Sequence, residues 1–202
     1  MWRELRTALL ALVGFSVLTG VLYPLALTLL ARLACPERAR GSLVVVDGVV
    51  RGSMLVGQDW RGASWFHGRP SATSPAPYVA LPSSGSNLGP MNPDLVRAIG
   101  MRAAQLRAEG LVGSLPVDLL TSSASGLDPP VTPAAARAQV ERVARARSLD
   151  PARVRALVDE HVEGRALGLL GEPRVNVLAL NLALDALAPS GGTPLDAPAP
   201  RR

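Results

Sequence analysis

The chain has 202 residues, of which 48% are hydrophobic and only 18% are charged. This length allows one globular domain with a short additional segment, and the low charge excludes a disordered polyelectrolyte. Between residues 34 and 187 there are 16 arginines and 14 acidic residues, which leaves a net charge of +2. A nucleic-acid-binding surface needs several cations in one stripe, so the sequence predicts no nucleic-acid partner.

All 21 basic residues are arginine. Without lysine the chain can form neither a Walker A loop nor a Schiff base on a lysine amine, so it is not an ATPase by itself. The only cysteine, Cys35, excludes an intramolecular disulfide. A lipoprotein cleavage site ahead of Cys35 is disfavoured because Arg32 stands three residues before it.

An uncharged run of 25 residues extends from Thr7 to Ala31. A helix needs about 20 apolar residues to cross a bilayer, and the apolar part of a signal peptide has only about 7–15, so we predict an uncleaved single-pass membrane anchor. We expect four parts: residues 1–6 before the membrane, a transmembrane helix over 7–31, a folded domain over 34–187 and a flexible tail over 188–202. Arginines on both sides of the span leave its orientation open.

One face of the predicted span carries small or polar residues. Four of them recur every four residues and form one ridge on a helix: Ser16, Gly20, Pro24 and Thr28. Because lipid gives little hydrophobic drive between helices, such ridges are where membrane helices dock. We therefore expect this ridge to contact a partner, although glycine and proline are also common in spans that dock nothing.

The first part of the domain has the pattern of strands. Residues 43–46 and 49–51 are rich in valine and flank Asp47-Gly48, the signal of a two-residue type I′ hairpin. We expect residues 53–58 to add a third strand, and residues 116–120 to form a further strand. Residues 61–92 show no period and many Ser, Pro and Gly residues, which predicts ordered but irregular loops.

Three helices are predicted from one repeated signal, a capping side chain directly before a proline at the first helical position. The pairs are Asn92-Pro93, Thr132-Pro133 and Asp150-Pro151, and the helices are expected to run to residues 109, 147 and 163. Residues 175–187 fit either a strand or a buried helix, and we predict a helix with Asn176 as its cap. The expected fold class is α+β: a transmembrane helix, then a single mixed domain with a short β-hairpin or sheet and about four helices.

The sequence gives little support for a metal or catalytic site. His67 and His161 are the only histidines, and no paired Cys or His spacing occurs, so we predict no zinc site. His161 lies seven residues after Val154 on the apolar face of its helix and is expected to be structural. No Gly-x-Ser-x-Gly or Ser-x-x-Lys sequence is present, so a hydrolase that uses a histidine base and a loop serine is the weakest alternative.

Two loops are candidates for recognition. Ser83, Ser84, Gly85 and Ser86 could cradle an anion with backbone N–H groups, a weak nucleotide-loop candidate that surface-turn composition explains equally well. Residues 66–71 place an aromatic ring, the imidazole of His67 and the guanidinium of Arg69 close together. This segment is either a recognition loop or a long loop that Arg69 fixes by pairing with a carboxylate.

Short stretches in a fixed order along residues 19–185 point to a known family. The first are Thr19-Gly20-Val21-Leu22-Tyr23-Pro24, Gly41-Ser42-Leu43, Gly57-Gln58 and Phe66-His67-Gly68-Arg69-Pro70-Ser71-Ala72. The later ones are Ser84-Gly85-Ser86-Asn87-Leu88-Gly89-Pro90, Pro116-Val117-Asp118-Leu119-Leu120-Thr121, Ser125-Gly126-Leu127-Asp128-Pro129, Val143-Ala144-Arg145-Ala146-Arg147 and Gly168-Leu169-Leu170-Gly171-Glu172-Pro173-Arg174-Val175-Asn176-Val177-Leu178. As an ordered set they resemble the C subunit of the Kdp-type potassium-transporting ATPase of bacteria. Only the proline-rich tail after Ala188 departs from the family.

The resemblance implies a subunit of the bacterial inner membrane with a cytoplasmic N-terminus and a periplasmic domain. Its partners would be a channel-like A subunit that selects potassium, an ATP-hydrolysing B subunit of the P-type and a small F subunit, all in the lipid bilayer. The family implies a role in assembly and a catalytic-chaperone role that raises ATP affinity, with Ser83 to Ser86 invoked as a nucleotide contact. The chain would have no catalytic residues and no cofactor of its own, because partner subunits would handle ATP and potassium.

The main alternative is a membrane-anchored periplasmic module that binds or senses a solute. Co-purification separates the two functions, since a pump subunit is recovered with large multispan partners and a free-standing module is recovered alone.

Overall fold

The computed structural model describes residues 1–188. The chain divides between Arg51 and Gly52 into two compact units. The predicted flexible tail, residues 188–202, lies outside the described residues except for Ala188. Each unit is considered by itself below.

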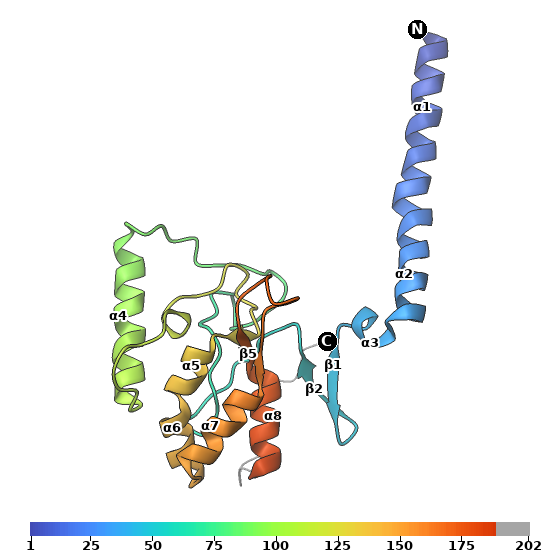
Figure 1. Cartoon of the computed structure of the whole chain (residues 1–202). Coiled ribbons are helices and arrows are strands. Elements are labelled where there is room, and N and C mark those ends of the chain that lie inside the picture. Colours follow the sequence, from blue (N-terminus) through green and yellow to red (C-terminus); the bar gives the residue numbers. More distant parts are fainter. Residues whose placement is uncertain (189–202) are drawn as a thin grey trace. The chain divides into compact units, whose positions relative to one another are not determined.

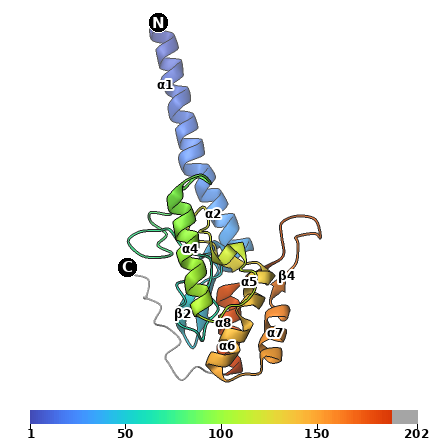
Figure 2. The ribbon, with the colours of Figure 1, turned by 90° about the vertical axis from the view of Figure 1, so that its left-hand side faces the viewer.

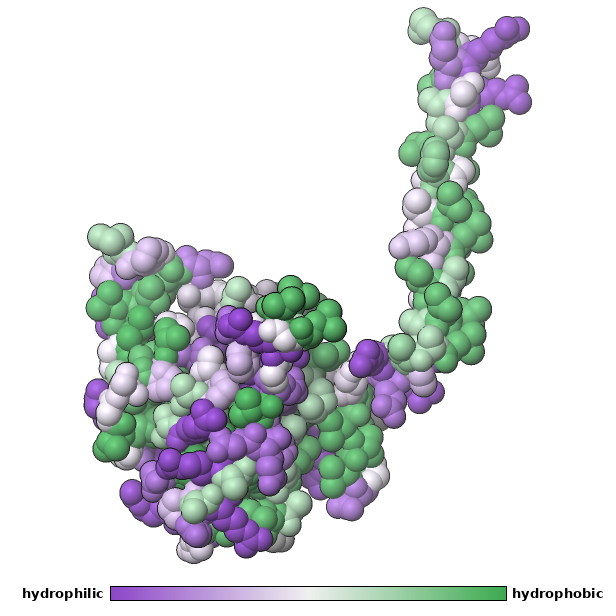
Figure 3. Space-filling view, in the orientation of Figure 1, coloured by the Kyte–Doolittle hydropathy of each residue, from purple (hydrophilic) through white to green (hydrophobic). Residues whose placement is uncertain are grey.

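The first unit begins with one continuous helix, Trp2–Ala34, of 33 residues, whose most apolar stretch of 18 residues has a mean hydropathy of 2.0. It consists of α1 (Trp2–Val17), a π-helical turn η1 (Leu18–Leu22) and α2 (Tyr23–Ala34). Figure 3 shows it as a hydrophobic rod with a hydrophilic N-terminal end. No residue of the helix is buried within the chain, and among the described residues it is the one helix long and apolar enough to cross a membrane.

The π-helical turn lies directly ahead of Pro24. Proline has no N–H to donate to the carbonyl four residues earlier, so a regular α-helix cannot continue unchanged through this position. The chain widens one turn instead, and the N–H of Tyr23 donates to the carbonyl of Leu18, five residues back. Such π-turns inside α-helices are frequently found at functional sites.

A short helix, α3 (Pro36–Ala39), leads to a two-stranded hairpin of β1 (Leu43–Val46) and β2 (Val49–Ser53). Asp47 and Gly48 have φ values of 53° and 74°, as a type I′ turn requires, so the predicted hairpin is confirmed. The predicted third strand over 53–58 is wrong. The hydroxyl of Ser53 accepts from the N–H of Leu55 and its carbonyl from that of Val56, which closes a turn in place of a strand.

The second unit contains helices packed against a small sheet. Its three strands, β3 (Pro130–Val131), β4 (Val162–Glu163) and β5 (Arg174–Asn176), are antiparallel in the order β3-β5-β4. Four helices pack with them: α5 (Pro133–Ala138), α6 (Val140–Arg147), α7 (Pro151–Glu160) and α8 (Val177–Leu187). Figures 1 and 2 show this cluster, with α4 (Pro93–Ala108) as a separate helix beside it. The α+β class is therefore confirmed.

The predicted caps are present. The side chains of Asn92, Thr132 and Asp150 each accept a hydrogen bond from a backbone N–H in the first turn of α4, α5 and α7. Asn176 does the same for α8, which confirms that the ambiguous last stretch is a helix. Val175, at its start, belongs instead to β5. The core is largely aliphatic, with Phe66 as its one fully buried aromatic ring among the described residues, and includes Ala136, Val140, Val143, Val154, Val158, Val175, Leu180 and Leu184.

Three predicted elements differ from the structure: one in type, one by a break and one in its end. The predicted strand over 116–120 is a 3₁₀ turn, η2 (Val117–Leu119), because the buried carboxylate of Asp118 turns back to accept the N–H of Thr132 at 2.7 Å. The helix expected over 133–147 is broken at Gln139, whose side chain is taken up by tertiary bonds. The helix expected to reach residue 163 ends at Glu160, since Val162 and Glu163 pair with β5.

The segment 57–92 contains the stretch 61–92 predicted to be ordered but irregular, and side chains there supply the bonds that secondary structure would otherwise make. The hydroxyl of Ser71 accepts from the N–H of Tyr78 and donates to the carbonyl of Gly126. The N–H of Gly57 donates to the carbonyl of Leu127 at 2.8 Å. This segment, called the strap below, is therefore fastened to residues 122–128.

Gly57 provides a steric test of the strap. A Cβ there would lie 2.8 Å from the carbonyl oxygen of Asp128 and 2.4 Å from the ring of Tyr78, so we expect Gly57→Ala to lower the free energy of unfolding by about 1–3 kcal/mol. Gly89→Ala meets nothing within 4 Å and should be neutral or slightly stabilising. Denaturant unfolding of the full chain in detergent measures both, and equal effects would contradict this packing.

Candidate functional site

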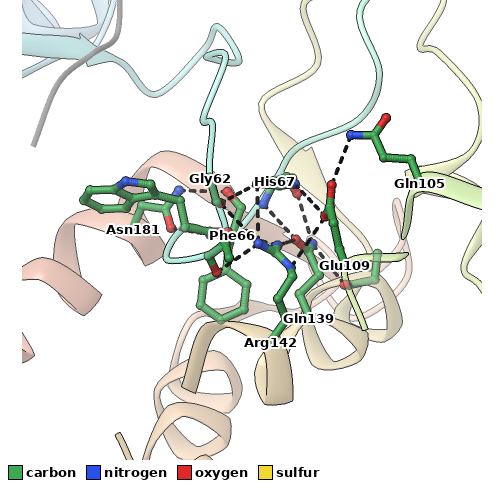
Figure 4. Close-up of polar contacts among 11 residues, drawn as sticks. Gly62, Phe66, His67, Gln105, Glu109, Gln139, Arg142 and Asn181 are labelled. Carbon is green, nitrogen blue, oxygen red and sulfur yellow. Dashed lines mark hydrogen bonds and ion pairs between the residues drawn. The ribbon is translucent and has the colours of Figure 1, made fainter. Parts of the chain in front are cut away.

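The Phe66-His67 backbone runs between two buried side-chain amides (Figure 4). Asn181 of α8 accepts from the N–H of Phe66 and donates to its carbonyl, both at 2.9 Å. Gln139 accepts from the N–H of His67 at 2.8 Å and donates to its carbonyl at 3.1 Å. Because buried backbone groups need partners, these amides do for the strap what a neighbouring strand would do in a sheet.

The residues before Phe66 are held by two arginines. Arg142 of α6 is buried, and its guanidinium donates to the carbonyls of Gly62, Ala63 and Trp65 at 3.0–3.2 Å. It also donates to Gln139 at 2.7 Å. Arg147 stacks over Trp65 at 4.3 Å from the ring centroid and donates to the carbonyl of Ser64 at 2.8 Å. The backbone carbonyls of residues 62–65 are thus hydrogen-bonded by two cations of one helix, α6.

His67 faces Arg142 and Glu109 at the end of this network. Its Nε2 lies 2.8 Å from the carbonyl of Gly62, and since a carbonyl only accepts, Nε2 carries a proton. Its Nδ1 lies 3.8 Å from Oε2 of Glu109, which is in turn 3.9 Å from Nε of Arg142. Burial, and then the charge of Arg142, lower the pKa of His67 in spite of Glu109. The neutral imidazole is therefore favoured.

Arg69, two residues further on, points to a different partner. It pairs with Asp128 at 3.2 Å and donates to the carbonyl of Ser122 at 3.4 Å. The backbone carbonyl of Arg69 accepts from the hydroxyl of Tyr78, and burial raises the pKa of that phenol to about 12. The carboxylate pairing left open by the sequence is thus present, and it joins the strap to the 122–128 loop.

A shallow pocket of about 470 Å³ lies beside these residues, lined by both His67 and Arg69 and by side chains of α4. Its wall includes Trp60 and Arg69, whose indole and Nε groups have no hydrogen-bond partner among residues 1–188. The same described range holds no group of three His, Cys, Asp or Glu side chains placed for a metal ion. His161 lies outside the pocket, where Nδ1 meets the carbonyl of Leu157 at 2.8 Å.

The serine-rich loop packs on a second loop of similar sequence. Ser84 donates its N–H to the carbonyl of Ser125 at 3.1 Å, and the hydroxyl of Ser83 reaches the same oxygen at 2.9 Å. A Cβ on Gly85 would lie 2.6 Å from the carbonyl oxygen of Ala124. The hydroxyl of Ser84 donates to the carbonyl of Gly85. The loop thus uses one of its N–H groups and two of its hydroxyls inside the domain, while Ser86 is exposed.

The predicted ridge of the span is exposed along its whole length. Each four-residue step on a regular α-helix overshoots a full turn by roughly 40°, but the wide turn η1 reduces the overshoot between Ser16 and Pro24. The hydroxyl of Thr28 donates to the carbonyl of Pro24 at 2.7 Å. The ridge is therefore straighter than regular geometry gives, and its threonine presents no unsatisfied donor to lipid.

Sequence reasoning found His67 and Arg69 but missed the residues that position the strap: Glu109, Gln139, Arg142 and Asn181. Arg142 and Asn181 lie within helices, and Gln139 and Glu109 lie at helix ends, close in sequence to core residues. A polar residue embedded in an apolar helix face was the available signal, since a buried amide or cation must have partners.

Comparisons with known proteins agree with one another. The model of the family described as "K+-transporting ATPase, c chain" matches residues 5–186. The chain is similar to the potassium-transporting ATPase KdpC subunit of Rhodopseudomonas palustris (strain BisB18), 51% identical over 92% of this chain and 99% of the relative. It is 56% identical to that of Sorangium cellulosum (strain So ce56), over 92% and 98%. It is 53% identical to that of Dechloromonas aromatica (strain RCB), over 91% and 97%.

Gln139 is the best single test of the network. We expect Gln139→Leu to lower the free energy of unfolding on the order of 3 kcal/mol, because it leaves the N–H and C=O of His67 and the Arg142 guanidinium short of partners. Gln105→Leu removes an amide that bonds only the exposed side of Glu109 and should change stability by less than about 0.5 kcal/mol. Denaturant unfolding of both variants checks the difference.

His67 makes stability depend on pH. Because its pKa is lowered on folding, the unfolded chain takes up this proton near pH 6.5, at a higher pH than the folded chain. The free energy of unfolding should therefore fall as the pH drops below about 6.5, until the folded imidazole is also protonated. The groups around this imidazole are Gly62, Arg142, Glu109 and Asp59.

The matched variant is His67→Gln, which keeps an N–H donor for the carbonyl of Gly62 and cannot titrate. Thermal unfolding of the full chain in detergent at pH 5 and pH 7.5 should show a smaller pH difference in this variant than in the wild type. An unchanged difference would assign the pH dependence to another group.

Proposed function

The chain belongs to the family of the K⁺-transporting ATPase c chain, and we propose that it is a non-catalytic subunit of an ATP-driven potassium uptake complex. In this proposal it supports assembly of the complex and raises the ATP affinity of the ATP-hydrolysing subunit. It would sit in the bacterial inner membrane with its main domain in the periplasm. Its partners would be a channel-like subunit, the ATP-hydrolysing subunit and a small single-span subunit.

The observation that carries the proposal is the helix Trp2–Ala34. It is apolar, long enough to span a bilayer and unburied within the chain, so lipid or other helices must surround it. In lipid, van der Waals packing of small residues is the main source of helix association. The exposed ridge of Ser16, Gly20, Pro24 and Thr28 is the face of this helix that allows the closest approach.

The second unit supports a role through contact. His67 and Arg69, the two recognition candidates, are bonded to Gly62 and Asp128 inside the domain. We propose that ATP and potassium are handled by the partner subunits and that this chain changes ATP affinity by stabilising one arrangement of the complex. Such a coupling requires that the chain bind that arrangement more tightly than the others.

The alternative function, a solute-binding module, is favoured by one observation. The pocket beside His67 includes two buried N–H groups, on Trp60 and Arg69, that have no acceptor among the described residues. A solute with a carbonyl or carboxylate oxygen would supply one. Purification of the chain without any partner from cells that produce the whole complex would favour this alternative.

The ridge gives the test of the proposed assembly role. We expect Gly20→Leu to lower recovery of the other ATPase subunits in a detergent pull-down about tenfold, because a bulky side chain separates the docked helices. Membrane insertion of the chain, measured by alkaline extraction, should be unchanged.

Two control variants make the test specific. Gly14→Leu introduces the same side chain about 120° around the same helix from Gly20, where nothing lies within 4 Å. Leu22→Ala shortens a side chain that is not part of the ridge. Both should retain the partners. Equal loss of partners from Gly14→Leu and Gly20→Leu would show that the ridge is not the docking face.

A further inference from the structure

The loop between β4 and β5 carries three exposed leucines, Leu167, Leu169 and Leu170, with exposed fractions of 92%, 81% and 65%. We call these three side chains the leucine tip. Figure 2 shows the loop projecting away from the helices, and Figure 3 shows a compact hydrophobic cluster at its end. Single exposed leucines are ordinary on protein surfaces, but three at one projecting point mark an interaction site.

The loop is held in shape by its own bonds. Ala166 and Leu170 form an isolated antiparallel bridge, with N–H to carbonyl distances of 2.8 and 2.9 Å. At the base, both carboxylate oxygens of Glu172 accept from Arg165 at 2.8–2.9 Å, and Glu163 pairs with Arg174 at 2.8 Å. These bonds restrain the backbone that carries the leucine tip, which lowers the entropy lost on binding.

The backbone under the tip does not favour leucine. Leu167 has φ 54°, in the left-handed region where asparagine and glycine are tolerated and a leucine is disfavoured. Its side chain is almost fully exposed, so it gains little packing against residues 1–188 in return. Packing among the described residues therefore gives no reason for a leucine at this position.

The residues around the leucine tip indicate whether it contacts lipid or a protein. Segments that insert into lipid usually carry tryptophan or tyrosine and an excess of cations, whereas residues 163–174 contain no aromatic residue, and their two arginines pair with their two carboxylates. Three leucines also cover far less than the roughly 800 Å² per partner that a stable independent interface needs. A small neutral apolar contact is sufficient only where another attachment already holds the partners together.

We propose that the leucine tip docks into an apolar groove on another subunit of the same ATPase. This inference rests on the proposed function, in which the membrane helix supplies the first attachment. The tip then supplies a second, separate one, and the complex dissociates only when both are released.

The test uses the full chain in the complete complex, with the variant Leu167→Asn, Leu169→Ser, Leu170→Ser. Asparagine suits the left-handed backbone at position 167, so the thermal unfolding midpoint of the chain should not fall. Val112→Ser, at an equally exposed valine in another loop, is the matched control. We expect the triple variant to leave the complex in detergent at least about tenfold faster than wild type and the control to be unchanged.

A photo-reactive amino acid in place of Leu169 identifies the molecule that the leucine tip contacts. An adduct with another ATPase subunit supports the proposal, and adducts only with lipid or with a second copy of this chain would overturn it. Unchanged dissociation of the triple variant would also overturn it, while leaving the proposed function intact. If even the wild-type chain holds no other subunit, the proposed function fails, and the leucine-tip proposal falls with it.

Discussion

The long strap of the second unit has no strand or helix of its own across Phe66 and His67, yet it is buried there, and buried peptide groups must be paired. Gln139, at the break between α5 and α6, and Asn181 of α8 meet that constraint. Their amides fix the strap against α6 and α8, and the guanidinium of Arg142 donates hydrogen bonds to three backbone carbonyls that precede Phe66. The positions of His67, of the Arg69–Asp128 pair and of the pocket all follow from this attachment. Loss of one amide therefore exposes several unpaired groups at once.

Local chemistry explains what could be predicted from the sequence. The type I′ hairpin at Asp47-Gly48 and the caps at Asn92, Thr132, Asp150 and Asn176 depend on neighbouring residues, so they are present as expected. The predictions fail where a contact distant in sequence decides the local structure. The segment predicted as a strand forms a turn in which Asp118 accepts from the N–H of Thr132. The helix expected to reach residue 163 ends earlier because Val162 and Glu163 pair with β5.

The candidate site divides in the same way. His67 and Arg69 could be selected because their side chains are chemically conspicuous, and the sequence already allowed for a carboxylate partner of Arg69. Which carboxylate it is, Asp128, depends on the strap crossing the 122–128 loop. Gln139 and Asn181 were missed because they lie 72 and 115 positions from the residues they bind. In sequence they look like interruptions of an apolar face.

Those separations also fix an order of events during synthesis. At about 5–20 residues per second, the ribosome needs on the order of ten seconds to make the chain between Phe66 and Asn181, which are 115 positions apart. During that time Trp60, Trp65 and Phe66 have emerged without the helices that cover them. The domain can close only when almost the whole chain has been made, so the membrane helix has left the ribosome well before the domain folds.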